Sequence, residues 1–365
     1  MQKLRFVIVG SGWRSLYYAR IARALPDRFE LCAMLCRTEE KAARMAAEYG
    51  IPAVTCEQAC IDLRPDVVVI AVSKASLAEV SAVWLQRGFT VLCETPAAMD
   101  VPALERLWAL QQSGCRLVIA EQYTRYPVIQ AMLAALDTGL IGQRQCLTLS
   151  LAHEYHAASL ARAFLGLQPG TPFTVSARTF TYPTARTFSR YERFTDRALK
   201  PSARTAAVFA FAGGQTLLYD FDSEQYRSPI RPSAVRLQGS LGYMDTDVFR
   251  WLDADGAPHT DTLRIDAMPV HTGDPNPNLA DYEEIRSVSL GSRTLYTPPF
   301  GLCGLSQDET AIAQLLAAAG AYARGEADAP YPLAGALEDA YAAILLRHAA
   351  ATGETLSSAR HPWHP

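Results

Sequence analysis

A glycine turn lies near the start of the chain, directly after the apolar run at residues 6–9. The turn consists of Gly10, Ser11, Gly12, Trp13 and Arg14. The first glycine permits a tight turn, and the second lets a pyrophosphate approach the backbone N–H groups of a following helix. Ser15 stands where a third glycine is usual, so an ordinary strand-to-helix turn stays open as an alternative. The position of the turn between an apolar run and a helical pattern favours dinucleotide binding.

Arg37 and Thr38 follow the next apolar run, at residues 30–36. Dinucleotide-binding folds usually have an Asp or Glu near this point, which accepts hydrogen bonds from the adenosine ribose. No acid stands directly at the end of this run. Because an arginine and a hydroxyl can bind a 2′-phosphate instead, we expect NADP to be preferred over NAD. The alternative is a solvated arginine in a loop.

His156 is the main candidate for acid–base chemistry, because an imidazole titrates near neutral pH. It lies on a helix expected from Glu154 to Leu165, with Ser159 and Arg162 at one-turn intervals along the same face. We expect His156 to act as general acid or base and Ser159 to hold the imidazole or contact the substrate. Arg162 is a candidate substrate ligand. The alternative for His156 is a hydrogen-bonded histidine between domains.

Two tyrosines and an arginine complete the candidate substrate site. Tyr155 is a candidate substrate ligand, although it is expected to point to another part of the helix surface than His156. Tyr123 is a second candidate proton donor or a structural residue, and Arg125 a candidate substrate ligand, where two domains are expected to meet. His153 lies three residues before His156, but no third ligand has a recognisable spacing, so we expect no metal site.

Length and composition limit the class of protein. A chain of 365 residues is longer than one ordinary domain, and 49% hydrophobic residues suffice for sizeable cores. The net charge of −3 gives no reason to expect nucleic acid or an anionic membrane as partner. The eight cysteines form no CxxC pair, and the sequence shows neither a signal peptide nor an apolar run near the length of a membrane span. We therefore expect a soluble cytoplasmic protein with reduced thiols.

The first third of the chain alternates between apolar runs of strand length and helical patterns. Strands are expected at 5–9, 30–36, 67–72, 90–93 and 116–120, and helices at 15–25, 39–49, 77–87 and 101–112. Continuous apolar runs are typical of parallel strands covered on both faces. The pattern predicts an α/β Rossmann domain, a doubly wound parallel sheet, at residues 1–122.

The remaining residues, 123–365, are expected to form an α+β domain for substrate binding and oligomerisation. Helices are expected at 128–138, 154–165, 309–324 and 336–352, and strands at 145–152, 173–182, 205–211, 215–221, 234–238, 242–245 and 248–252. These predict a large, mostly antiparallel sheet with helices on one side. Residues 183–204 and 267–307 look irregular. The first of these segments is rich in arginine, including Arg190, and is expected either to contact an anionic group or to form a solvated or dimer-facing loop.

Several motifs together resemble the Gfo/Idh/MocA family of pyridine-nucleotide oxidoreductases. They are Gly10–Gly12, Gly88–Pro96, Gln122–Pro127, Gly139–Gly142, His156–Gly166 and Gln238–Gly242. The resemblance implies hydride transfer between NAD(P) and a hydroxyl or carbonyl carbon of a sugar- or cyclitol-like substrate. It also implies a homo-oligomer, a dimer or tetramer paired through the C-terminal sheet. The cofactor contacts that it adds are Val72, Ser73, Glu94, Thr95, Pro96 and Gln122.

The catalytic pattern of that family is incomplete in this chain. The resemblance implies a lysine where this chain has Thr95, and an aspartate where it has Ala152, so that only His156 remains. Two other hypotheses therefore stay open. One is a cofactor-retaining enzyme of elimination or epimerisation, and the other is a catalytically weak nucleotide-binding protein.

Overall fold

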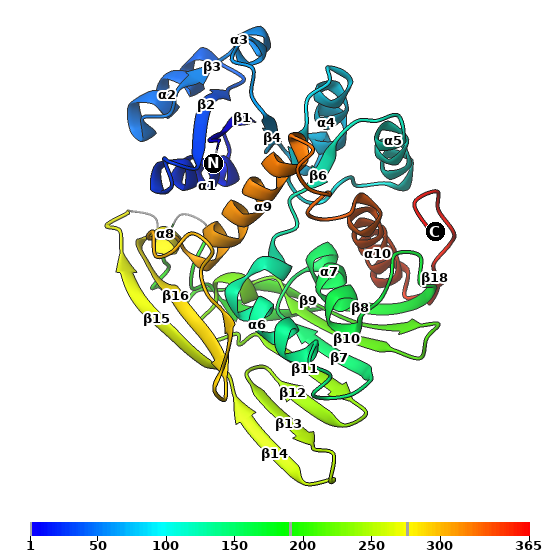
Figure 1. The fold of residues 1–365 in the computed structure, drawn as a ribbon. Coiled ribbons are helices and arrows are strands. Elements are labelled where there is room, and N and C mark those ends of the chain that lie inside the picture. The colour runs from blue at the N-terminus through cyan, green and yellow to red at the C-terminus, as the bar shows by residue number, and fades with distance from the viewer. Residues whose placement is uncertain (1, 190–191, 275–276) are drawn as a thin grey trace. The chain divides into compact units, whose positions relative to one another are not determined.

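The computed structural model describes residues 2–189, 192–274 and 277–365, and its contacts divide the chain into two compact units. Unit 1 comprises Met1–Arg125, Cys303–Ala340 and His361–His364, and unit 2 comprises Tyr126–Leu302, Tyr341–Arg360 and Pro365. The residues of helix α10 (Leu333–Thr352) are divided between them. Unit 1 contains a six-stranded sheet, and unit 2 contains a nine-stranded and a three-stranded sheet (Figure 1).

Unit 1 is built on a six-stranded parallel sheet. Its strands are β1 (Leu4–Val9), β2 (Phe29–Leu35), β3 (Ala53–Val54), β4 (Val67–Ile70), β5 (Val91–Cys93) and β6 (Leu117–Ile119). They lie in the order β3-β2-β1-β4-β5-β6, and neighbouring strands pair in parallel. This is the strand order of a Rossmann fold. The valines and isoleucine of β4 are all buried, as expected for a central strand covered on both faces.

Side-chain caps mark the starts of α2, α5 and α9 among the helices of unit 1. The helices of unit 1 are α1 (Trp13–Ala24), α2 (Glu39–Tyr49), α3 (Glu57–Asp62), α4 (Leu77–Gln86), α5 (Val101–Gln112) and α9 (Gln307–Ala323), with short 3₁₀ turns η1 (Lys74–Ser76) and η2 (Tyr123–Arg125). The side chains of Thr38 and Asp100 accept backbone N–H groups at the starts of α2 and α5. Ser306 and Glu309 form a capping box at the start of α9.

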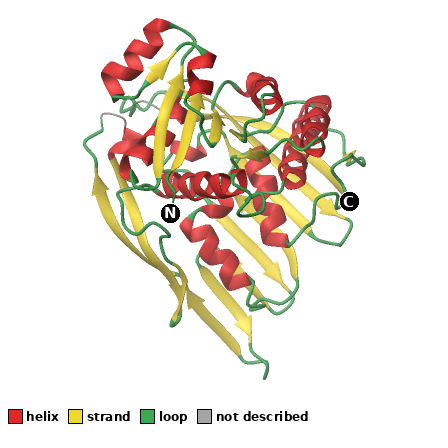
Figure 2. Ribbon diagram, turned by 45° about the horizontal axis from the view of Figure 1, so that its top comes forward, coloured by secondary structure: helices red, strands yellow, loops and turns green. Residues whose placement is uncertain are grey.

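Unit 2 is built on a nine-stranded sheet in the order β14-β13-β12-β11-β7-β10-β9-β8-β18. The strands are β7 (Arg144–Ser150), β8 (Phe173–Ala185), β9 (Leu199–Phe211), β10 (Thr216–Asp222), β11 (Ala234–Gly239), β12 (Gly242–Asp245), β13 (Val248–Leu252), β14 (Pro258–Thr262) and β18 (Leu356–Ser357). Neighbours are antiparallel except for β10 and β7, which run parallel. Helix α7 (Glu154–Leu165) packs against β7 on one face of the sheet, and α6 (Pro127–Leu136) packs against α7 (Figure 1; Figure 2 shows the strands in yellow and the helices in red). The predicted fold class, a Rossmann domain with a mostly antiparallel second domain, is confirmed.

The two segments expected to be irregular contain strands. β8 extends to Ala185 and β9 begins at Leu199, so both flanks of residues 183–204 pair across a long hairpin. Prolines and charged residues on these exposed flanks hid the alternation. Arg190 lies outside the residues that the structure describes.

Residues 267–307 likewise hold most of a three-stranded sheet. It is formed by β15 (Arg264–His271), β16 (Asp281–Leu290) and β17 (Arg293–Tyr296), with the short helix α8 (Pro277–Ala280) between the first two strands. Many strand positions are exposed or half-exposed, so the apolar alternation that would reveal a strand is weak.

The contact units and the predicted domain ranges divide the chain differently. Helix α9 belongs to unit 1 because it packs against α1 and β4. The boundary between residues 122 and 123 stays a prediction.

Candidate functional site

The two glycines of the first turn have different surroundings. Gly10 has φ +117°, and a Cβ atom there would lie 2.3 Å from the carbonyl oxygen of Ala71, so this position requires glycine. Gly12 is the N-cap of α1, and a Cβ atom there would meet nothing within 4 Å. A ligand can therefore approach the backbone at Gly12 without meeting a side chain there, and the start of a helix suits an anion.

Three further segments lie at the same edge of the sheet as the glycine turn. Because β1, β4, β5 and β6 are parallel neighbours, their carboxyl ends lie side by side. Gly10 follows β1, Val72 follows β4, Glu94 follows β5 and Gln122 follows β6. Ligands of open α/β sheets bind outside these carboxyl ends. Strand order thus brings together residues that are more than 100 positions apart in the sequence.

Ser73, Thr95 and Pro96 lie next to these residues in the sequence. Ser73 follows Val72 and its hydroxyl lies 2.9 Å from that of Ser76. Thr95 and Pro96 follow Glu94 and are joined by a cis peptide bond. Thr95 has no ammonium group, so it can orient a ligand but supplies no cation.

The residues expected to recognise a 2′-phosphate lie at the end of β2. Arg37 and Thr38 are both exposed there. The Thr38 hydroxyl accepts the backbone N–H of Lys41 at 3.3 Å and so caps α2. Ser11 lies beside the same strand end, since it hydrogen-bonds the Cys36 thiol, whose pKa is raised by burial. Arg37 is thus the exposed cation at the place where the ribose of a dinucleotide is expected.

A charged network joins the end of β5 to the starts of α1 and α9. Arg14 Nη1 donates to Asp308 Oδ2 at 2.8 Å, and Arg14 Nε lies 3.6 Å from Glu94 Oε2. The Tyr18 hydroxyl donates to Glu94 Oε1 at 2.7 Å, and Gln122 Nε2 donates to Asp308 Oδ1 at 3.2 Å. We call these five residues the Arg14 network.

Burial sets the charges within the Arg14 network. Desolvation raises the pKa of the Glu94 carboxyl, Arg14 lowers it, and the neighbouring Asp308 raises it again. The pKa of Tyr18 is also raised, first by its burial and then by Glu94. Tyr18 therefore stays a neutral hydrogen-bond donor, and Arg14 is the cation that offsets the two carboxylates.

A second group of candidate residues surrounds the start of α7 in unit 2. His153 is the N-cap of α7, and its backbone N–H donates to the Tyr226 hydroxyl at 2.9 Å. Its ring nitrogens contact two phenols: Nδ1 lies 2.6 Å from the Tyr226 hydroxyl, and Nε2 lies 3.1 Å from the Tyr155 hydroxyl. The His156 ring lies 5.1 Å from the His153 ring and 4.4 Å from the Tyr155 ring, between centroids. We call these four residues the His153 cluster.

The expectation that Tyr155 points away from His156 was wrong. His153 has an extended backbone and Glu154 has φ +43°, so the chain enters the helix by a sharp bend rather than by a regular turn. Glu154 is held there by Arg347, whose Nη1 lies 2.7 Å from Glu154 Oε2, and by its N–H, which donates to the Tyr219 hydroxyl at 3.2 Å. Helical spacing does not apply before the first full turn.

The remaining residues predicted on α7 occupy the expected helix. His156 is 5% exposed and Ser159 is 1% exposed, so both are buried in unit 2. Arg162 lies half-buried in the last turn of α7, and its carbonyl oxygen accepts the N–H groups that end the helix. The structure thus brings His156 together with His153 and Tyr155.

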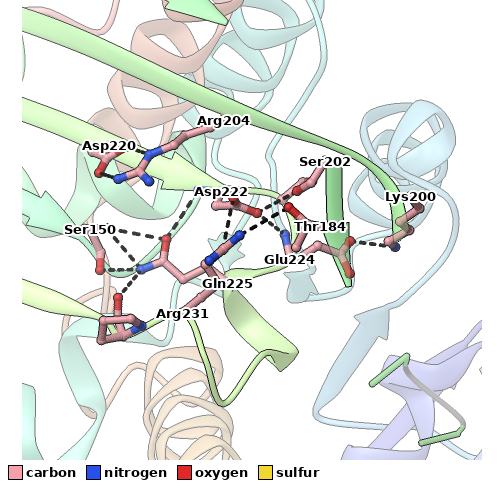
Figure 3. A network of polar contacts seen from close by, with 12 residues as sticks. Ser150, Thr184, Lys200, Ser202, Arg204, Asp220, Asp222, Glu224, Gln225 and Arg231 are labelled. Atoms are coloured by element: carbon pink, nitrogen blue, oxygen red, sulfur yellow. Dashed lines mark hydrogen bonds and ion pairs between the residues drawn. The ribbon is translucent and has the colours of Figure 1, made fainter. Parts of the chain in front are cut away.

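A polar network fixes the turn that carries Tyr226 (Figure 3). Tyr226 lies in η3 (Gln225–Arg227). The buried Gln225 amide donates to the Ser150 carbonyl at 2.7 Å and to the Pro232 carbonyl at 3.1 Å, and its oxygen accepts the Asp222 N–H at 3.3 Å. The turn is therefore tied to the end of β7, directly before His153.

Asp222 extends the same network to the long hairpin of β8 and β9. Its carboxylate accepts the Ser202 hydroxyl at 2.7 Å and the Glu224 N–H at 2.9 Å, and it lies 3.5 Å from Arg231 Nε. Arg231 also donates to the Thr184 hydroxyl. Figure 3 shows these contacts together with the ion pairs Lys200–Glu224 and Arg204–Asp220.

Tyr123 and Arg125 lie in η2 of unit 1. Tyr123 is buried, and its N–H donates to Glu121 Oε1 at 3.1 Å. Arg125 donates to the Pro330 carbonyl at 3.0 Å, and its burial lowers the pKa of the guanidinium. Both residues take part in the packing of unit 1, and their roles toward a substrate stay predictions.

Sequence analysis missed Asp308 and Tyr226. Asp308 is the second residue of α9, and the Ser306–Glu309 capping box marks that helix start in the sequence. Tyr226 follows β10 in a segment without any periodic pattern. Neither residue has a sequence signal for its partner, because the partner is distant in the chain.

The described parts of the chain contain neither a metal-binding cluster nor a membrane-spanning helix. Within them, no group of His, Cys, Asp and Glu side chains is arranged to hold a metal ion. None of their helices is long and apolar enough to cross a membrane. A surface cavity of about 680 Å³ lies at the opposite edge of the unit 1 sheet, lined among others by Asp66, Thr90 and Arg116. No candidate site residue lines it.

Comparison with known proteins identifies the first part of the chain. Residues 4–121 match the Gfo/Idh/MocA model, described as an oxidoreductase family with an NAD-binding Rossmann fold. Over these residues the chain is similar to the Gfo/Idh/MocA oxidoreductases. The resemblance found in the motifs is confirmed, and the expectation of an NAD(P)-dependent oxidoreductase agrees with it. None of the curated proteins matches the sequence.

Solved structures of similar fold extend over the whole chain. A levoglucosan dehydrogenase in complex with NADH and levoglucosan is 17% identical, with a TM-score of 0.64, and 98% of this chain and 99% of that chain are covered. The WlbA dehydrogenase from Bordetella pertussis, in complex with NADH and UDP-GlcNAcA, is 15% identical, with a TM-score of 0.65 and 99% of both chains covered.

A third similar structure holds the phosphorylated cofactor. The biliverdin reductase from Synechocystis sp. PCC 6803, in complex with biliverdin and NADP+, is 16% identical, with a TM-score of 0.62. The match covers 95% of this chain and 99% of that chain. At these identities the comparisons show a common fold for both units.

Proposed function

We propose that this protein is an NAD(P)-dependent oxidoreductase that transfers hydride to or from a hydroxyl or carbonyl carbon of a small polyhydroxylated substrate. The observation that carries the proposal is the convergence of Gly10, Val72, Glu94 and Gln122 at the carboxyl edge of the unit 1 sheet, beside the open start of α1. The sugar ligands of the levoglucosan dehydrogenase and of WlbA support a sugar- or cyclitol-like substrate.

Residues of unit 1 would hold the cofactor. The backbone N–H groups from Gly12 to Arg14 would bind the pyrophosphate, and Arg37 with Thr38 the 2′-phosphate of NADP. The remaining contacts would come from Ser11, Val72, Ser73, Glu94, Thr95, Pro96 and Gln122. When bound, the nicotinamide ring supplies or accepts the hydride. NADP is proposed as the preferred cofactor because Arg37 is exposed where NAD-specific folds have an acid.

A residue of unit 2 would donate or accept the proton in this reaction. A carbinol carbon loses hydride only as its hydroxyl loses a proton, so a base must reach that hydroxyl. His156 is proposed as this acid or base. Ser159, Tyr155 and Arg162 of unit 2 are proposed as further contacts, together with Tyr123 and Arg125 of unit 1. The ring of His153 lies beside His156 and is hydrogen-bonded to Tyr155 and to Tyr226, which is 38% exposed.

A homo-oligomer through the nine-stranded sheet is part of the proposal. Val208 on β9 and Leu218 on β10 are neighbours on adjacent strands, and both side chains are exposed on the sheet. Tyr243 on β12 adds a third exposed apolar group to the sheet. A cytoplasmic location also stays part of the proposal, because all eight cysteines are free thiols.

Fluorescence titration of NADPH and NADH against wild type and Arg37→Ala tests the cofactor half. Loss of one charge-assisted contact should weaken NADPH binding by roughly 10- to 100-fold and leave NADH binding unchanged. Arg44→Ala is the matched control, because Arg44 is an exposed arginine of α2 that pairs with Glu48. Equal binding of both nucleotides by wild type would contradict the NADP preference, and binding of neither would contradict the oxidoreductase proposal.

A panel of sugars, cyclitols and their ketones, assayed with the bound nucleotide, tests the catalytic half. His156→Gln should lower kcat by about 10²- to 10⁴-fold without changing nucleotide affinity. Tight nucleotide binding without any turnover would favour a nucleotide-binding protein. A cofactor that co-purifies and does not exchange would favour elimination or epimerisation.

A further inference from the structure

We propose that Asp308, on α9, is a positioning residue for the nicotinamide half of the cofactor site. This inference rests on the proposed function, because it concerns how unit 1 holds the nucleotide. Asp308 lies far outside the dinucleotide-binding motifs in the sequence, 294 residues from Arg14 and 186 residues from Gln122. The structure nevertheless places its carboxylate between these two candidate cofactor residues.

The two oxygens of Asp308 have separate tasks. Oδ2 accepts a hydrogen bond from Arg14 Nη1 at 2.8 Å, and Oδ1 accepts one from Gln122 Nε2 at 3.2 Å. Arg14 belongs to the glycine turn after β1, and Gln122 follows β6. One side chain therefore connects segments from two strands of the edge where the cofactor is expected.

Arg14 links Asp308 to Glu94. Its guanidinium is held by Asp308 on one side and lies 3.6 Å from Glu94 on another. The rings of Trp13 and Tyr17 each lie 5.1 Å from the guanidinium carbon, which restricts it further. We infer that Arg14 serves as a fixed counter-ion that orients Glu94, while backbone N–H groups are left to bind the phosphates.

The start of α9 is built to hold Asp308 in place. The buried Glu309 accepts the Ser306 N–H at 3.0 Å and the Ser306 hydroxyl at 2.8 Å, which fixes the first turn of the helix. The other oxygen of Glu309 lies 2.5 Å from Arg20 Nε on α1. The ion pairs Arg14–Asp308 and Arg20–Glu309 both connect α9 to α1, and the first of them involves a candidate cofactor residue.

The direction in which Asp308→Asn changes nucleotide affinity distinguishes a positioning role from a purely electrostatic one. Asp308→Asn keeps the shape of the side chain and removes one negative charge. A nucleotide is an anion, so the loss of that charge alone would strengthen its binding. If Asp308 positions Arg14 and Gln122, the same substitution must instead weaken binding.

The test measures by titration how tightly wild type, Asp308→Asn and Arg14→Lys bind NADPH, NADH and adenosine 2′,5′-bisphosphate. Both variants should weaken the two dinucleotides by about tenfold, because a charged hydrogen bond that orients the site is lost. Adenosine 2′,5′-bisphosphate should bind as in wild type, because Arg37 at the end of β2 contacts that half. Arg14→Lys keeps the charge but not the fork that bridges two carboxylates, so it tests the network from its other side.

Arg20→Gln is the matched control. It removes the Arg20–Glu309 ion pair between α1 and α9 and should leave all three affinities unchanged while it lowers the melting temperature. If Arg20→Gln weakened NADPH binding as much as Asp308→Asn does, the packing of α9 against α1 would explain both effects. That result would overturn the inference. Unchanged or tighter NADPH binding by Asp308→Asn, or a loss of adenosine 2′,5′-bisphosphate binding, would overturn it too. Wild-type protein that binds neither dinucleotide would instead overturn the proposed function, and this inference with it.

Discussion

In unit 1 the Arg14 guanidinium lies between two carboxylates, whereas in unit 2 the His153 imidazole lies between two phenols. The Arg14 network is held by charge, and burial makes its ionisation depend on each neighbour. The His153 cluster is held by hydrogen bonds between an imidazole and two phenols and by ring contacts. The first arrangement suits the orientation of a charged ligand, and the second suits the transfer of a proton.

The two sites also differ in how the backbone prepares them. Around the Arg14 network, four parallel strands end at one edge and deliver their loops together. Around the His153 cluster, one bend before α7 and the Gln225 turn must fit each other through side-chain hydrogen bonds. We therefore expect the first site to depend most on backbone geometry and the second most on individual polar contacts.

The largest expected effect is that of Gly10→Ala. The new Cβ atom would lie 2.3 Å from the Ala71 carbonyl oxygen, in a backbone conformation that alanine rarely adopts. We expect a loss of roughly 3–5 kcal/mol in the free energy of unfolding, measured with urea. Gly12→Ala, where the new atom meets nothing, should cost only about 0.5 kcal/mol and yet weaken nucleotide binding. Equal stability of the two variants would remove backbone geometry as the distinguishing feature of unit 1.

A smaller effect is expected for Tyr226→Phe in unit 2. The variant leaves the His153 N–H and Nδ1 without the phenol hydroxyl that they contact. Loss of these hydrogen bonds should lower the free energy of unfolding by about 1–2 kcal/mol. Tyr243→Phe, on the exposed face of β12, serves as control and should change stability by less than about 0.5 kcal/mol. Indistinguishable unfolding curves for the two variants would show that the hydroxyl of Tyr226 does not support the His153 cluster.

The smallest effect, and the one most specific to charge, concerns the pH dependence of Glu94. Its pKa is raised in the folded protein, so the native state binds more protons than the unfolded state between the usual glutamate range and the raised value. The free energy of unfolding should therefore fall as pH rises through that window, by about 1.4 kcal/mol for each unit of the shift.

Glu94→Gln removes this titration, so chemical unfolding at several pH values compares the two proteins directly. The variant should lack that fall and gain stability relative to wild type as pH rises. Parallel pH profiles for Glu94→Gln and wild type would mean that Glu94 is not desolvated, and would contradict the role given to burial in the Arg14 network.

Prediction from the sequence failed where periodicity was hidden or interrupted. The hairpin flanks near Pro183 and Pro201 pair directly with each other, although their exposed side chains show no apolar alternation. Tyr155 was placed on the wrong side because the bend at Glu154 precedes the regular helix. In both cases the backbone conformation depends on partners outside the segment.

By itself the sequence determined the Rossmann domain, its glycine turn and the identity of most candidate residues. These follow from contiguous patterns, because apolar runs, glycines and helical spacing are local properties of the chain. Only the tertiary structure decided that Asp308 meets Arg14 and that Tyr226 meets His153, across 294 and 73 residues. A carboxylate or a phenol carries no sequence signal for a distant partner, since that contact forms only when buried strands and helices have fixed where both side chains lie.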